Sequence, residues 1–109
     1  TAEKAQAISE KFDRPLMFTE IGFRSIQSPW KHPHAEAGGA AVSEEDQALA
    51  YQAVCEVLQP SDWMNGIFWW KWPSYTQYPT EESKSFTPMG KQAQEVLADW
   101  FQKNLEAAQ

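Results

Sequence analysis

The chain has 109 residues, of which 42% are hydrophobic and 14% aromatic, a composition that fits one small globular unit over residues 1–109 and excludes a disordered chain. The formal net charge is −6 and the pI is about 4.8. This balance argues against partners such as nucleic acid or an anionic membrane, because both need clustered Lys and Arg. An acidic surface fits an uncharged substrate.

Cys55 is the single cysteine, so no internal disulfide can form, and we expect a buried structural thiol on a helix. No apolar run approaches the roughly 20 residues of a transmembrane helix. No signal peptide is visible, so the compartment, secreted or cytoplasmic, stays open. The chain starts at Thr1 and its first residues resemble the middle of a domain, which predicts a piece of a longer protein.

The first predicted element is a helix over residues 1–12. Ala5, Ile8 and Phe12 recur at helical spacing with charged residues between them, so we expect this face to pack on a core. The residues at 13–15 end the helix.

Two short apolar runs then predict strands. Residues 16–21 (LMFTEI) lack polar alternation, which is typical of a parallel strand covered on both faces, and Gly22 ends the run. Residues 67–70 form the second predicted buried strand, entered through Asn65 and Gly66.

Two further helices follow from apolar stripes and capping signals. Ser43, with Asp46 three residues on, resembles a capping box ahead of the second helix, and Thr87 with Pro88 is expected to cap the third. The stripes are Ala50, Tyr51, Val54, Val57 and Leu58 in the second helix, and Ala93, Val96, Leu97, Trp100, Phe101 and Leu105 in the third.

Strands that alternate with helices predict an α/β fold with parallel pairing and right-handed crossovers. Two parallel strands cannot close a core, so we expect a slice of a larger sheet or barrel, completed by further chain or by self-association. The long irregular stretches follow the strands. In α/β barrels that end of the strands carries the active site, and it is where Glu20, Lys71 and Trp72 fall.

Glu20 is an unusual residue for an apolar run, because an isolated buried charge is costly. It is either a structural carboxylate with a partner or a site. The second strand ends in WWKW, and the loops add Trp30, Tyr75 and Tyr78. Carboxylates beside Trp and Tyr suit carbohydrate, which offers hydroxyls for hydrogen bonds and flat C–H faces for stacking. We therefore expect an oligosaccharide or polysaccharide partner.

Three stretches, PLMFTEIGFRS, GIFWWKWPS and FTPMGKQAQEVLADWF, together resemble the C-terminal end of glycoside hydrolase family 113. This family holds endo-β-1,4-mannanase-type enzymes of the retaining (β/α)₈ clan. The resemblance runs from strand seven to helix eight and implies the C-terminal quarter of a TIM-barrel catalytic domain. It also implies that Glu20 is the nucleophile of a double displacement. The acid/base glutamate belongs to strand four, to which nothing here corresponds, so the chain alone is expected to be inactive.

The resemblance further implies that a tryptophan at the end of strand eight forms the floor of the subsite for the reacting sugar. Trp70 and Trp72 are both candidates, because they share strand parity. Lys71 could bind a sugar hydroxyl or lower the nucleophile's pKa. Arg24 and Trp30 are subsite-wall candidates by position alone.

Two other functions stay open at this point: a carbohydrate-binding module, and a non-catalytic α/β unit that self-assembles through its strand edges. His32 and His34 form an HxH pair, but no cluster with ligand spacing accompanies them, so we expect neither a metal site nor another cofactor.

Overall fold

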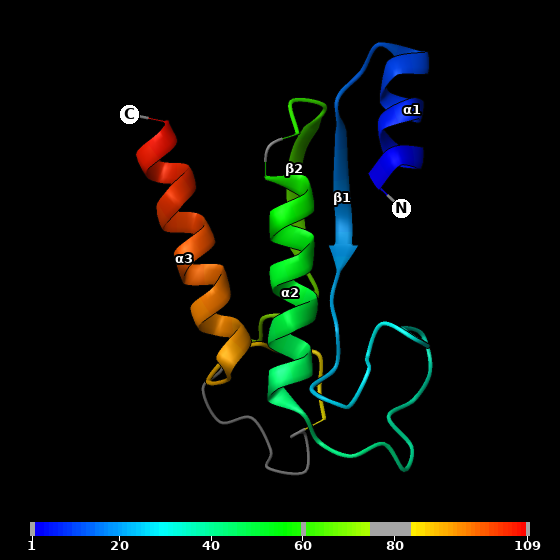
Figure 1. Cartoon of the computed structure of the whole chain (residues 1–109), viewed down its shortest axis with the longest axis vertical. Helices are drawn as coiled ribbons and strands as arrows, with labels where there is room; N and C mark the ends of the chain where they lie inside the picture. Colours follow the sequence, from blue (N-terminus) through cyan, green and yellow to red (C-terminus); the bar gives the residue numbers. More distant parts are fainter. Residues whose placement is uncertain (1, 60, 75–83, 109) are drawn as a thin grey trace.

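The computed structural model describes residues 2–59, 61–74 and 84–108. The elements follow the predicted order: α1 (Ala2–Phe12), β1 (Leu16–Ile21), α2 (Glu44–Leu58), β2 (Met64–Trp69) and α3 (Gln92–Ala107). Figure 1 shows the two strands beside each other, with α1 and α3 on opposite sides of the unit. The strands pair in parallel, which confirms the α/β class. None of these three helices has the length and hydropathy that crossing a membrane requires.

Strand β2 begins earlier than the sequence predicted. Its ladder to β1 already pairs Leu16 with Met64, and the main-chain N–H of Leu16 donates to the carbonyl of Trp63. Asn65 and Gly66 therefore belong to the strand and are not the turn before it. Pairing with β1 outweighs the low strand propensity of these two residues, because each hydrogen bond of the ladder satisfies one backbone group on each strand.

The helices α2 and α3 cover one face of the sheet. Trp69 of β2 stacks on Tyr51 of α2 with ring centroids 4.8 Å apart, and it meets Trp100 of α3 edge-on at 6.0 Å. Tyr51, Cys55, Ala93 and Leu97 form the buried cluster beneath these rings. The expectation that Cys55 is a buried thiol is confirmed.

The other face of the sheet is open, contrary to the expected cover on both faces. Met17 of β1 is 49% exposed, and Phe68 and Trp70 at the end of β2 are 62% and 45% exposed. Among the described residues, these side chains therefore remain about half exposed or more. We call this surface the open face, defined by Met17, Phe68 and Trp70.

The apolar stripe of α1 is also uncovered, so the prediction that it faces a core is wrong for this chain. Ile8 is 50% and Phe12 64% exposed, whereas the buried residue of the helix is Ser9, whose hydroxyl donates to the carbonyl of Arg14. Between α1, β1 and α2 lies an apolar groove of about 550 Å³, lined by Ala2, Phe18 and Val57 among others. No described element fills this groove.

The caps of the two longer helices differ from each other. Ser43 caps α2 as predicted, since its hydroxyl accepts the N–H of Asp46 at 3.1 Å. Thr87 does not cap α3, which begins at Gln92 after the N-cap Lys91. Gly90 has a φ of 73°, a left-handed conformation that a continuous helix cannot contain. The hydroxyl of Thr87 closes a separate turn by accepting the N–H of Met89.

Gln47, near the start of α2, joins the segments that follow the two strands. Its side chain is fully buried, and its Nε2 donates to the carbonyls of Phe23, Phe86 and Thr87 at 2.9, 3.4 and 3.3 Å. Figure 1 shows the loop after β1 and the described residues that follow β2 at the end of the sheet where the strands finish. One amide therefore holds the chain after β1 against the chain before α3.

Replacement of Gln47 by Leu should lower the free energy of unfolding by about 2–3 kcal/mol, because buried carbonyls lose their donor and a lost buried partner costs about 1–3 kcal/mol. The matched control is Gln52→Leu on the same helix, where the side chain is exposed and donates a hydrogen bond to Glu56. Urea unfolding of both variants checks this expectation. Equal stabilities for the two variants would contradict the role given to Gln47.

Candidate active site

A β-bulge in β1 determines where Glu20 points. Phe18 pairs with Ile67 and Ile21 pairs with Trp69, so three steps along β1 match two steps along β2. In a strictly alternating strand Glu20 would share the helix-facing side with Phe18. Instead, Phe18 and Ile21 both line the groove against α2, while Thr19 and Glu20 are both exposed. The extra residue thus turns the carboxylate away from the helices, a common effect of bulges near functional sites.

Trp70 lies at the end of β2, next to the strand that carries Glu20. Its main-chain N–H donates to the carbonyl of Ile21 at 2.7 Å, which extends the ladder by one residue beyond β2. Its indole is 45% exposed, whereas the neighbouring Trp69 packs into the core. Of this tandem pair, one tryptophan serves packing and the other is available to a ligand.

Lys71 and Trp72 follow directly and are exposed, with Trp72 at 51%. The peptide bond between Trp70 and Lys71 is cis. Trp70, Lys71 and Trp72 follow the end of β2, and Glu20 lies near the end of β1. These four predicted site residues therefore lie at the same end of the sheet. Tyr75 and Tyr78, the other aromatic candidates, lie outside the described residues.

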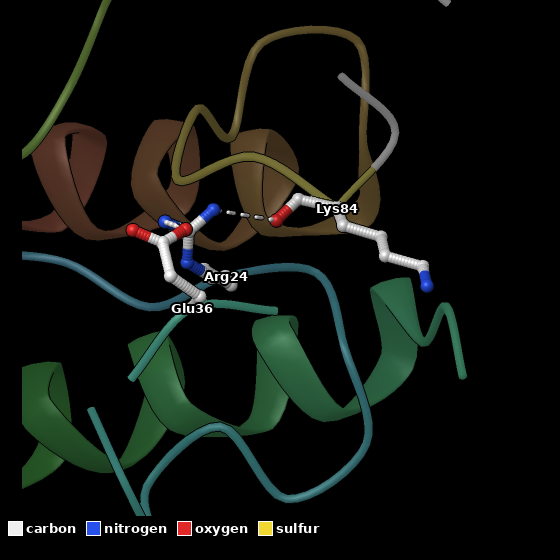
Figure 2. A network of polar contacts seen from close by, with 3 residues as sticks. All are labelled: Arg24, Glu36 and Lys84. Carbon is white, nitrogen blue, oxygen red and sulfur yellow. Dashed lines mark hydrogen bonds and ion pairs between the residues drawn. The ribbon is translucent and has the colours of Figure 1, made fainter. Parts of the chain in front are cut away.

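Arg24 holds the loop after β1 against the segment before α3, as Figure 2 shows. Its guanidinium lies over the ring of Phe86, 4.4 Å from the centroid, and donates to the carbonyl of Lys84 at 3.5 Å. It also forms an ion pair with Glu36 at 3.5 Å. The side chain is only 22% exposed, so Arg24 is engaged mainly in joining these segments.

Trp30 is the predicted site residue that lies away from Glu20. It is 48% exposed and lines the apolar groove with Phe23 and Leu49, on the side of β1 that faces α2. His32 and His34 are exposed on the same loop. Among the described residues, no group of three His, Cys, Asp or Glu side chains lies close enough to hold a metal ion.

Lys91 was missed by the sequence reasoning and lies beneath these loops. Its ammonium donates to the hydroxyl of Ser25 at 3.0 Å and to the carbonyl and hydroxyl of Ser85 at 3.4 and 3.3 Å. Ser25 is fully buried, and its N–H also donates to the carbonyl of Ser85. No periodicity or motif signals these contacts, because they join a lysine and two serines far apart in the chain.

Burial perturbs two titratable groups of the core. It raises the pKa of the Tyr51 phenol, and, with a smaller contribution from the charge of Glu56, it raises the pKa of Cys55 from 9.0 to about 11. Both groups stay protonated at neutral pH and lie on the helix side of the sheet. They belong to the packing beneath the site and not to its chemistry.

The comparisons with solved structures define the fold. The chain matches a structure described as "Complex structure of GH113 beta-1,4-mannanase" at a TM-score of 0.79 and 24% identity, over 92% of this chain and 33% of that one. It matches the β-mannanase AaManA of Alicyclobacillus acidocaldarius in complex with ManMIm at a TM-score of 0.80 and 28% identity, over 94% and 33%. The fold is therefore a piece of a TIM barrel that spans about one third of the length of the structures it matches.

The family follows from the sequence match. The model of Glycoside Hydrolase Family 113 covers residues 1–105, and the chain belongs to this family. The comparison with curated protein sequences finds no match. The resemblance expected from the TEIG and WWKW stretches is thus confirmed at the level of family and fold.

The raised pKa of Cys55 predicts alkaline destabilisation. The unfolded thiol loses its proton near pH 9.0 and the folded thiol near pH 11, so unfolding releases a proton between these values and becomes more favourable as the pH rises. The contribution of the protonated Cys55 thiol to the free energy of unfolding is fully present below about pH 9 and is lost by about pH 11. Urea midpoints measured from pH 8 to pH 11 check this. Cys55→Ala should give a flatter dependence between pH 9 and 10, and identical slopes would contradict the assignment.

Proposed function

We propose that this chain is the C-terminal part of a retaining glycoside hydrolase that acts on β-1,4-mannan, with Glu20 as the nucleophile. The observation that carries the proposal is the bulge in β1, which leaves Glu20 exposed at the carboxyl end of the strand. Membership of family 113 and the likeness to structures described as β-1,4-mannanases support the substrate class.

The proposed chemistry is a double displacement. A carboxylate oxygen of Glu20 attacks the anomeric carbon, the bond from that carbon to the glycosidic oxygen breaks, and a second carboxylic acid protonates the departing oxygen. Water then hydrolyses the glycosyl-enzyme ester with help from the second carboxylate. In retaining enzymes the two carboxyl groups lie about 5–5.5 Å apart. The second group would come from strand four of the barrel, so the chain alone is expected to be inactive.

Trp70 is the better candidate for the aromatic floor of the reacting subsite. Its backbone is hydrogen-bonded to the strand that carries Glu20, so its main chain has a fixed position relative to the end of that strand. Trp72 lies two residues further, beyond β2, and would contribute to a neighbouring subsite. Lys71, also exposed there, would bind a sugar hydroxyl. Arg24 would act indirectly by holding the loop after β1, whereas Trp30, on the same loop, lines the apolar groove away from Glu20.

Glu20→Gln in the full-length protein should lower kcat on mannooligosaccharides by about 10⁴-fold or more, the scale expected when a catalytic nucleophile is removed. A 2-deoxy-2-fluoro-β-mannobiosyl fluoride should label the parent protein on Glu20, as read by peptide mass mapping. Glu95→Gln, an exposed glutamate in the first turn of α3, is the control and should retain activity. A label on another residue would contradict the assignment of Glu20.

Trp70→Ala should lower kcat/KM more than Trp72→Ala does. Loss of a stacked indole face of about 120 Å² removes about 3 kcal/mol at about 25 cal/mol per Å², which is a loss of about 100-fold. For Trp72→Ala we expect a loss of about tenfold or less, because it would contact a more distant sugar. Steady-state kinetics on mannotetraose decides between the two, and the reverse order would move the floor to Trp72.

A further inference from the structure

Gly22, two residues after Glu20, lies against the backbone of Trp70. A Cβ built on Gly22 would overlap the carbonyl oxygen of Trp70 and lie 2.9 Å from its carbonyl carbon and 3.2 Å from its Cβ. Gly66 in the neighbouring strand differs, because a Cβ there would meet only the Met17 side chain at 3.8 Å or more, an ordinary contact. Of these two strand-region glycines, only Gly22 is required by a close approach.

The close approach has a local cause. The N–H of Trp70 donates to the carbonyl of Ile21 at 2.7 Å, which draws Trp70 onto the peptide unit that joins Ile21 to Gly22. The carbonyl of Trp70 then lies over the Gly22 α-carbon. Any side chain at position 22 would push these two backbones apart, and the carbonyl carbon would have to move from 2.9 Å to at least 3.4 Å to reach an ordinary separation.

We propose that Gly22 is a positioning residue: its missing side chain lets the Trp70 backbone seat on the end of β1 and so sets the Trp70 indole relative to the Glu20 carboxylate. This inference rests on the proposed function, in which Glu20 attacks the sugar that stacks on Trp70. The contact lies within two residues of the nucleophile and involves the main chain of Trp70 itself. A displacement of the Trp70 main chain at this contact would therefore move the Trp70 indole relative to the Glu20 carboxylate.

The test is the rate at which the full-length protein is inactivated by 2-deoxy-2-fluoro-β-mannobiosyl fluoride. In that step a Glu20 carboxylate oxygen bonds to the anomeric carbon while the C–F bond breaks and fluoride leaves. Gly22→Ala should lower the limiting inactivation rate constant by about 30- to 100-fold, since a misplacement of about 1 Å can cost on the order of 100-fold. Gly66→Ala carries the same added methyl on the neighbouring strand and should inactivate at the parent rate.

A second comparison separates positioning from general destabilisation. Leu97→Ala removes a buried core side chain of α3 and should lower the thermal midpoint while leaving the inactivation rate constant at the parent value below that midpoint. In a Trp70→Ala background, Gly22→Ala should cost about fivefold or less, because the indole that it displaces is already absent. A full 30-fold loss in that background would overturn the proposal.

The remaining outcomes are decisive as well. An unchanged rate constant in Gly22→Ala, with the label still on Glu20, would overturn the positioning role and leave the proposed function intact. A label on another residue of the parent protein would reject the proposed function itself. If Gly22→Ala yields no folded protein, Trp70→Ala decides alone: an unchanged inactivation rate overturns the proposal, and a large loss supports it.

Discussion

The uneven pairing of β1 with β2 is the constraint on which the site depends. Phe18 pairs with Ile67 and Ile21 with Trp69, so three steps along β1 match two steps along β2. The apolar side chains of Phe18 and Ile21 both remain on the helix side, where they line the groove against α2. The surplus residue is absorbed by Thr19 and Glu20, which turn outward. This local shift in register therefore reconciles an apolar strand with an outward carboxylate, without burying its charge.

The loops at the same end of the sheet are held by polar contacts that reach across the sequence. Gln47 of α2 donates to carbonyls on both sides, Arg24 lies over Phe86, and Lys91 bonds Ser25 and Ser85. Each of these side chains joins the segment after β1 to the segment before α3. Because two of the three are cationic and all use backbone carbonyls or hydroxyls as acceptors, they satisfy buried oxygens that the irregular chain leaves without ladder partners. Arg24, which the sequence predicted to form part of a subsite wall, is one of the side chains that join these two segments.

The features of the fold that depend on the sequence of one helix or strand alone were predicted correctly. Strand β1 and the Ser43 cap of α2 follow from local composition and were placed correctly. The start of β2 was placed too late, because Asn65 and Gly66 are strand residues only through pairing with β1. The start of α3 was placed too early, because the left-handed Gly90 cannot be recognised without backbone angles. The direction of the Glu20 side chain could not be predicted from the sequence either, because strict alternation would place it on the same face as Phe18.

The tandem tryptophans at the end of β2 have an optical consequence. Trp69 lies in a ring cluster with Tyr51 and Trp100, where close, tilted chromophores couple and produce near-ultraviolet dichroism. Trp70 and Trp72 are about half exposed and face water, so their emission is red-shifted and open to quenching by acrylamide. Dichroism therefore reports on the packing of the sheet against the helices, whereas quenchable emission reports on the exposed tryptophans, among them Trp70 and Trp72. Two adjacent tryptophans thus give separate optical signals, one from the buried core and one from the surface.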